Sequence, residues 1–459
     1  MIVHYFHILG LLFLTLSIVW RNPLVRLSLL FIALSPVYTM SLVDIVPLAT
    51  FIKVPEILLA LLTFLLILKV IQGGRIGWRS VLFVLLCFIP FVLALGKNTL
   101  HFSPIYVWEI NPELRSVWYD KLAMRNDITV ANFSQLLYIS AGIVTAFVFL
   151  NIKLQREQTV RAIKYGLLLV SFVGVIQLIT FYSDQYEIYL EVFYNNITAN
   201  YHRLPYQQLF GVKRVNSTLG EPSIFSLYLV LSYLMLYLLQ DHDIRALIRS
   251  KSVIFSFFIG LMSTSGTFYL GVGLLSLFFI WYGKRYRWPL LLCLAIGISI
   301  ALFLIEAYGL PSILTYIIEQ KRDSFTERFF FGVLLPIENI SKSPLFGFSF
   351  GSDRPTTLLF NLIISLGFAG FTIFLCSFAL LRSRKLFTFL SYYIILGLLS
   401  PDLHYLFVWA YIGILGSATT SITMPRRFKD IDLPNATDKS LEVRSDYSVP
   451  MMEQNFVRG

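Results

Sequence analysis

The segment Gly211–Ser223 (G-V-K-R-V-N-S-T-L-G-E-P-S) carries the first group of side chains suited to chemistry. Lys213 and Arg214 are adjacent cations, and the planar guanidinium of Arg214 offers paired N–H donors that fit phosphate oxygens. Glu221 can either accept a proton or orient Arg214. We predict that Arg214 and Lys213 bind an anion at a membrane surface. The alternative is a loop-to-helix junction whose basic side chains reach the headgroups.

A second polar segment, Lys321–Gly351, combines arginine with aromatic residues. Arg328 precedes a run of phenylalanines, which indicates a short interfacial helix with its cation at headgroup level. Gly347 would allow a tight backbone turn. The alternative is an aromatic belt in which Arg328 is only an anchor.

Other titratable residues are weaker candidates for catalysis. No Asp/His cluster occurs in the loops, and the cysteines show no metal-ligand spacing, so we predict that the chain uses neither a metal nor a cofactor. The weaker acid–base candidates are Asp323, Glu327, Asp353, His202 and His404.

The elements that must position these side chains are membrane helices. The chain has 459 residues, of which 57% are hydrophobic and 14% charged. With roughly 20 helical residues needed to cross the hydrocarbon core, about 12–13 spans are expected. They run approximately over 3–20, 27–43, 54–71, 80–96, 133–151, 163–182, 223–239, 252–264, 267–283, 289–306, 357–381, 386–400 and 404–421.

The distribution of positive charge predicts the orientation. The net charge of +11 comes from short basic clusters between apolar runs, which is typical of membrane topology and not of nucleic-acid binding. With the 21–26 connection in the cytoplasm, every later short connection on that side is basic. The N-terminus is then outside and the C-terminus inside.

The sequence therefore predicts an all-α, polytopic transmembrane helix bundle over residues 1–424. Long outer loops at about 97–132, 184–222 and 307–356 are expected to contain short interfacial helices and to carry function. The span interiors contain almost no charge, and Lys53 and Glu56 lie near an outer end, where a lysine can reach the headgroups. Residues 425–459 are expected to form a disordered cytoplasmic tail.

Several of these segments together resemble the O-antigen polymerase and ligase family, over roughly residues 130–420. Arg214–Ser223 resembles the segment before a central helix of that family, and Arg328–Gly351 resembles its large periplasmic loop. Ser263–Thr267 is similar to its Thr/Ser-rich hairpin, and Asn361–Gly370 to the helix after the large loop.

The chain also departs from the family pattern. Thr356 and Thr357 stand where the ligases have a His-Asn pair, which favours a polymerase over a ligase. The Arg-x15-Gly spacing of the polymerases is not met, so we assign no role from it. The hairpin has Gly266 and Thr267 where an arginine often follows the serine.

The resemblance implies a glycosyltransferase of the bacterial cytoplasmic (inner) membrane. Such an enzyme moves a glycan from undecaprenyl pyrophosphate to a sugar hydroxyl of a second lipid-linked chain, on the periplasmic face. Arg214 and Arg328 would stabilise the charge that develops on the pyrophosphate, with Glu221 as the third catalytic candidate. Lys213, Arg322, Gly347 and Arg354 are expected to contact the substrate.

The implied partners are lipid-linked oligosaccharides as donor and acceptor, membrane lipid and a chain-length regulator, without nucleic acid. Two other functions stay open. A ligase would transfer the glycan to another lipid acceptor. A transporter or flippase for the lipid-linked glycan would need a polar path through the bundle, and the charge-free spans argue against it.

Overall fold

The computed structural model describes residues 2–3, 8, 11–12, 22–45, 50–100, 106–110, 121–125, 130–193, 208–209, 212–282, 333–348, 357–397, 403 and 405–420. All of them belong to one compact unit, residues 1–420. The predicted tail, 425–459, lies outside the described residues, as do the predicted span 289–306 and most of the span 3–20.

The described part of the chain is mostly helical, in agreement with the predicted all-α bundle. Its helices are α2 (Pro23–Leu34), α3 (Val54–Ile71), α4 (Trp78–Leu100), α5 (Val130–Asn151), α6 (Arg156–Tyr182), α7 (Tyr186–Phe193), α8 (Pro222–Leu239), α9 (Ile244–Ile248), α10 (Lys251–Met262), α11 (Gly266–Tyr282), α14 (Leu335–Ile340), α15 (Leu358–Ala379), α16 (Arg384–Leu396) and α17 (Leu406–Thr420). The short helices α7 and α14 fall in predicted outer loops.

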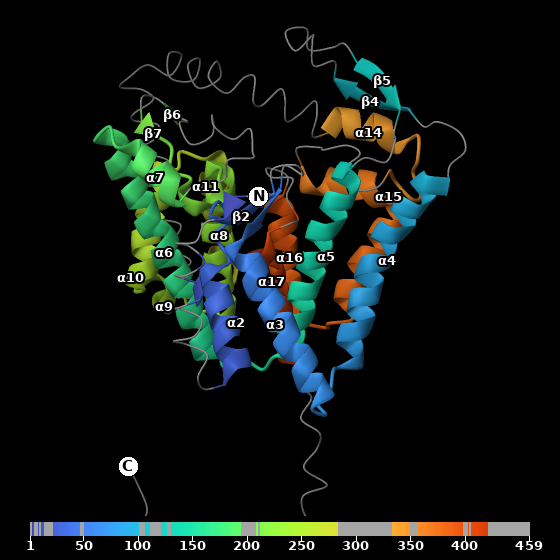
Figure 1. Cartoon of the computed structure of the whole chain (residues 1–459). Coiled ribbons are helices and arrows are strands. Elements are labelled where there is room, and N and C mark those ends of the chain that lie inside the picture. The colour runs from blue at the N-terminus through green and yellow to red at the C-terminus, as the bar shows by residue number, and fades with distance from the viewer. Residues whose placement is uncertain are drawn as a thin grey trace, which may run out of the picture. The chain divides into compact units, whose positions relative to one another are not determined.

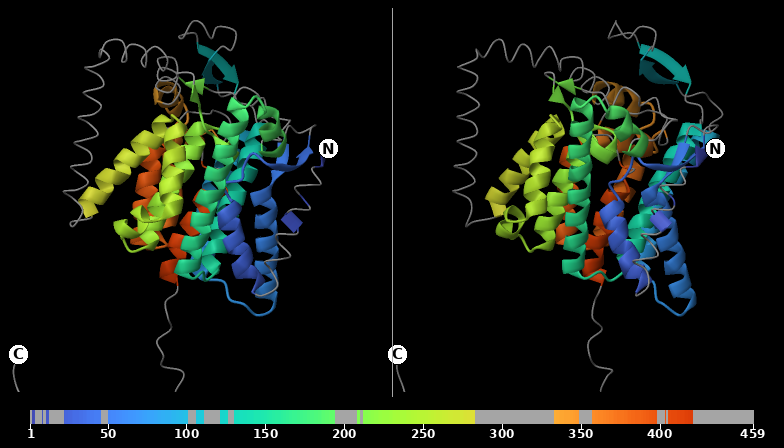
Figure 2. Two further views of the ribbon diagram at one scale, coloured as in Figure 1. Left: turned by 90° about the vertical axis from the view of Figure 1, so that its left-hand side faces the viewer. Right: turned by 60° about the vertical axis from the view of Figure 1, so that its left-hand side comes forward.

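Six of the described helices are long and apolar enough to cross a membrane: α3, α4, α5, α6, α8 and α15. The other apolar helices, α2, α10, α11 and α17, are shorter. From α3 to α8, successive long helices reverse direction along the bundle (Figures 1 and 2). We call the end at which α4 and α6 finish and α5 and α8 begin the loop end, because α7 and α14 also lie there (Figure 1).

Small antiparallel sheets accompany the helices and were not predicted. β1 (Ile2–Val3), β2 (Ser41–Ile45) and β3 (Thr50–Lys53) form one sheet, β4 (Tyr106–Ile110) pairs with β5 (Lys121–Arg125), and β6 (Gln208–Leu209) pairs with β7 (Val212–Lys213). The second predicted span, 27–43, is wrong in its second half. α2 ends at Leu34 because Pro36 cannot continue a helix.

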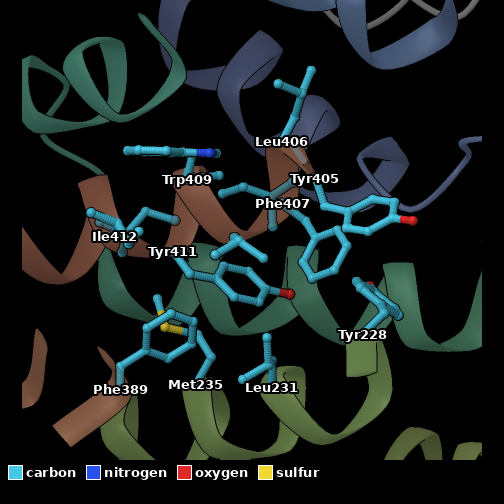
Figure 3. Packing of buried hydrophobic residues seen from close by; sticks show 14 of the residues in the cluster. Tyr228, Leu231, Met235, Phe389, Tyr405, Leu406, Phe407, Trp409, Tyr411 and Ile412 are labelled. Carbon is cyan, nitrogen blue, oxygen red and sulfur yellow. The ribbon is translucent and has the colours of Figure 1, made fainter. Parts of the chain in front are cut away.

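α8 is the central helix of the described bundle. Every residue from Ile224 to Leu238 is buried, so the helix is enclosed on all sides. Figure 3 shows apolar and aromatic side chains of α8, α16 and α17 packed together, and the rings of Tyr228 and Phe407 lie 5.1 Å apart. Because α8 is fixed in this way, the segment that precedes Pro222 has a rigid support.

α5 and α17 approach each other closely through small residues. A Cβ atom at Gly142 would lie 2.3 Å from Nε1 of Trp409, and one at Gly413 would lie 2.6 Å from the carbonyl oxygen of Ala146. Small residues at such crossings let membrane helices pack by van der Waals contact.

α15 is interrupted at Gly367, where φ is 67° and ψ is 174°. The expected single span 357–381 is therefore two helical pieces. Backbone groups freed by the break bond to the preceding turn: Phe348 N–H donates to Ile364 O (2.9 Å) and Phe368 N–H donates to Pro344 O (2.7 Å). A break in an apolar helix is tolerated because its backbone groups find such partners.

We predict that Gly367→Ala strongly destabilises the protein. The new Cβ would lie 2.2 Å from the carbonyl carbon of Leu345, and the positive φ is unfavourable for alanine. A loss of about 2 kcal/mol or more is expected from strain and clash. Thermal unfolding of the detergent-solubilised chain measures it. Gly273→Ala is the control, since no atom lies within 4 Å of its Cβ position. Equal melting temperatures of the Gly367→Ala and Gly273→Ala proteins would show that the break at Gly367 is not needed for stability.

Candidate functional site

The segment Val215–Gly220 is buried at the loop end, and the side chain of Gln177 on α6 holds it there. Gln177 Nε2 donates to the hydroxyl of Tyr186 (2.9 Å) and to Oδ1 of Asn216. Its Oε1 accepts the backbone N–H groups of Asn216 and Ser217, both at 3.1 Å. The amide therefore uses both donors and accepts two bonds, which is its full capacity.

Two further residues of this segment bind neighbouring elements. Ser217 Oγ donates to Val170 O (2.6 Å) on α6. Thr218 Oγ1 donates to Pro36 O (2.9 Å), and Thr218 O accepts the N–H of Tyr38 (2.9 Å) in the turn after α2. The polar side chains of the Asn-Ser-Thr run thus have structural partners and fix the position of the residues on either side.

Arg214, at the start of this segment, is half-buried and lies against the turn between α10 and α11. Its Nε donates to Ser263 O (3.4 Å), and Val215 N–H donates to Met262 O (3.2 Å). Ser263 Oγ also hydrogen-bonds Ser226 Oγ of α8 (3.0 Å). The structure therefore brings together two segments that are separate in the sequence, Arg214–Ser223 and the α10–α11 turn.

The α10–α11 turn and the start of α11 contain two hydroxyls that have no hydrogen-bond partner in the part of the chain described. They belong to Thr264, whose φ of 46° is unfavourable for a β-branched residue, and to Thr267, which is 2% exposed. Buried hydroxyls usually have partners. The turn beside Arg214 thus offers polar atoms that internal bonds do not occupy.

Glu221 is the N-cap residue of α8, and Pro222 is its first residue, one residue before the predicted start of this span at 223. The carboxylate of Glu221 accepts a hydrogen bond from Ser223 Oγ (3.1 Å) and is partly exposed. The positive end of α8 favours its charged form. Its assignment as a proton acceptor or as an orienting group for Arg214 stays a prediction.

The side chain of Lys213 does not reach the membrane surface, as the alternative interpretation of the sequence had suggested, but packs inside the protein. It is 0% exposed, its ammonium donates to Arg214 O (2.6 Å), and the rings of Phe181 and Tyr186 lie 5.7 Å away. Burial, together with the charge of Arg214, lowers the pKa of Lys213 to about 7. In this arrangement Lys213 supports the backbone of Arg214, and its expected contact with a substrate stays a prediction.

Gly347 adopts the predicted tight turn, with φ of 65°. Its carbonyl oxygen accepts a hydrogen bond from Lys97 Nζ (3.2 Å), at the end of α4. The other predicted residues of the large loop lie outside the described residues, so the expected approach of Arg328 to Arg214 stays a prediction. These are Arg322, Asp323, Glu327, Arg328, Asp353 and Arg354; His202 and His404 also lie outside.

Sequence reasoning missed Gln177 and Lys97. Gln177 is a polar residue within an apolar run of α6, and such a residue inside a membrane segment is a signal of a buried polar contact. Lys97 gave no signal because a lysine near the end of an apolar run is ordinary. Only the folded chain brings it next to Gly347.

No protein-family model, curated protein or solved structure matches this chain. Within the described ranges, no group of three or more His, Cys, Asp or Glu residues is placed to hold a metal ion. The prediction of metal-independent chemistry is not tested by this geometry.

We predict that Gln177→Leu lowers the free energy of unfolding by about 3 kcal/mol or more. The substitution leaves the N–H groups of Asn216 and Ser217 buried without their acceptor, at about 1–3 kcal/mol each. Thermal unfolding in detergent measures the loss. Thr180→Val is the matched control on the same helix, because Thr180 Oγ1 bonds only to carbonyls of its own helix. A Gln177→Leu protein as stable as Thr180→Val would show that the hydrogen bonds of Gln177 do not contribute to stability.

We also predict that Lys213 makes the stability of the protein depend on pH. The folded-state pKa of about 7 is below that of an unfolded lysine, so the unfolded chain binds more protons between about pH 7 and pH 10. Stability should therefore rise with pH across this interval. In Lys213→Met this rise should be smaller, measured as melting temperature against pH. Superimposable profiles of the two proteins would refute the assignment.

Proposed function

We propose that this chain is a membrane glycosyltransferase that polymerises undecaprenyl-pyrophosphate-linked oligosaccharide units at the periplasmic face of the bacterial cytoplasmic membrane. The observation that carries the proposal is the placement of Arg214. Its guanidinium lies at the loop end of an apolar helix bundle, on a segment that Gln177 holds in place. A fixed cation at the end of membrane helices fits the charged head of a lipid-linked substrate.

The proposed reaction uses this cation to stabilise the leaving group. A hydroxyl oxygen of the acceptor sugar attacks the anomeric carbon of the donor, and the bond from that carbon to the pyrophosphate oxygen breaks. The electron pair leaves with the pyrophosphate, whose growing charge Arg214 stabilises. The hydroxyl proton passes to a base, for which Glu221 is the candidate nearest in sequence. Because Arg214 is already held in position, little reorganisation is needed during the reaction.

The composition of the central helix α8 favours a reaction at the membrane surface over transport of a substrate through the bundle. From Pro222 to Leu239, α8 contains neither a carboxylate nor a cation. Its hydroxyls include Ser232, bonded to Tyr411 (2.9 Å), and Tyr233, bonded to Ser256 (2.8 Å). Hydroxyls paired in this way hold helices together, and α8 offers no charged group along its length to a substrate. This favours the glycosyltransferase over the transporter.

We predict that Arg214→Ala abolishes long glycan chains and leaves single lipid-linked units on the periplasmic face. Arg214→Lys should also reduce polymerisation strongly, because an ammonium lacks the paired donors of the guanidinium. The measurement is the chain-length distribution of glycan in cells that supply the lipid-linked unit. The same result is expected for Arg328→Ala.

Arg161→Ala is the matched control for loss of a cation, because Arg161 is 70% exposed in the first half of α6, away from the loop end. It should leave the chain lengths unchanged. Accumulation of single units on the cytoplasmic face in Arg214→Ala would instead indicate transport and would refute the polymerase. Full activity of both lysine and alanine variants would mean that Arg214 is only a surface anchor.

A further inference from the structure

The lysines at the loop end differ in what balances their charge. The ammonium of Lys53 lies 3.2 Å from the centre of the Tyr38 ring and 3.9 Å from the carboxylate of Glu56, so it packs inward and does not reach the headgroups as the sequence suggested. Lys213 can release its proton near neutral pH, because its pKa is lowered to about 7. Neither lysine is an uncompensated charge open to a ligand.

Lys97 contacts only neutral groups among the described residues. Its Nζ donates to Ser343 Oγ and to Gly347 O (3.2 Å), and the ring of Phe348 lies 5.8 Å away. No ion pair joins Lys97 to a carboxylate in the described part of the chain. An ammonium carries three donors and prefers anionic partners, so a half-buried lysine with two neutral acceptors still has bonding capacity for an anion.

The position of this ammonium is fixed by the break in α15. Ser343 Oγ donates to Gly347 O (2.9 Å), and both residues are buried. Gly347 in turn packs so closely on α15 that a Cβ there would lie 2.4 Å from Ile364 O. The turn that receives Lys97 is therefore rigid, as a binding site requires.

Apolar side chains are exposed around this turn. Leu345 is 60% exposed and Phe346 46% exposed, within the turn itself. Phe368, 50% exposed, follows the break in α15, and Ile337, 52% exposed, lies on α14. A fixed cation beside exposed apolar side chains matches a ligand with an anionic head and a hydrocarbon tail.

We propose that Lys97 and the turn Ser343–Phe348 form a second lipid-phosphate site, which holds the diphosphate head of the acceptor lipid. This assignment rests on the proposed function, in which two lipid-linked substrates must meet. Arg214 lies with α6, α8 and α10, whereas Lys97 lies with α4, α14 and α15, on the other side of the loop end (Figure 1).

The different chemical roles of donor and acceptor decide which of the two lipids we propose for each site. The donor's bond to pyrophosphate breaks, so its site needs the guanidinium of Arg214 against developing charge. The acceptor's pyrophosphate bond stays intact, and its head needs only to be anchored. The single point charge of Lys97 suffices for that.

The test is the binding of farnesyl diphosphate, a short isoprenoid diphosphate, to the full-length purified chain by isothermal titration calorimetry. The wild-type chain should bind one molecule at each site. Lys97→Met keeps the length of the side chain and removes the charge, and should weaken one of the two binding events about tenfold or more. Arg214→Ala should weaken the other. Lys69→Met, an exposed lysine in the last turn of α3, is the control and should change neither.

The outcomes separate the two proposals. Unchanged binding in Lys97→Met would overturn the second site and leave the polymerase untouched. Loss of one event in Lys97→Met with no effect of Arg214→Ala would support the second site and count against the proposed donor site. If Lys97→Met does not fold, Ser343→Ala must weaken the same event, since it removes the hydroxyl that orients the ammonium.

Two further probes distinguish the source of the phosphate. Inorganic pyrophosphate, which lacks the tail, should bind the Lys97 site more weakly than farnesyl diphosphate does. Nanodiscs with phosphatidylglycerol should not displace farnesyl diphosphate from it at equal concentration. Equal displacement would overturn the assignment to the acceptor, because the site would then bind bulk membrane lipid.

Discussion

The arrangement at the loop end depends on the amide of Gln177. Without it, the backbone N–H groups of Asn216 and Ser217 would be buried without an acceptor. Its four bonds hold the segment Val215–Gly220, and therefore the position of Arg214 at the start of that segment. Because the remaining bonds of Ser217 and Thr218 reach α6 and the turn after α2, the segment is held from both sides.

Charge balance decides what each cation at this end can do. Lys53 is compensated by Glu56 and an aromatic ring, and Lys213 is enclosed by Phe181 and Tyr186. Arg214 and Lys97 are the two cations for which we propose ligands. Arg214 has a guanidinium fork next to two hydroxyls that have no partner among the described residues, and Lys97 has a point charge beside exposed apolar side chains. Their difference in chemistry matches the different demands of a leaving group and of an anchored head.

The break at Gly367 links the large loop to the bundle. The turn Pro344–Phe348 takes over the hydrogen bonds that α15 cannot make, and in doing so it receives Lys97. A substitution at Gly367 would therefore displace the turn that binds Lys97, because backbone hydrogen bonds join that turn to the break. Arg214 is held by different helices, so the two sites have separate supports within the described structure.

The sequence by itself determined the helices with long apolar runs, because hydrophobic length is a local property. It predicted α3 at 54–71, the start of α8 to within one residue, and the tight turn at Gly347. It did not reveal the break at Gly367, the early end of α2 or the small sheets. The break at Gly367 and the turn after α2 depend on backbone partners elsewhere in the chain, in the turn at Pro344 and at Thr218. The early end of α2 follows from Pro36, a local signal within an otherwise apolar run.

The same distinction applies to the candidate site. Residue types indicated that Arg214, Glu221 and Lys213 could do chemistry, since charge and hydrogen-bonding capacity belong to the side chain itself. Whether a cation faces a ligand or the interior depends on its surroundings. Only the tertiary structure enclosed Lys213 among aromatic rings, held Asn216 with Gln177 and placed Lys97 on the turn at Gly347, because these are contacts between distant segments.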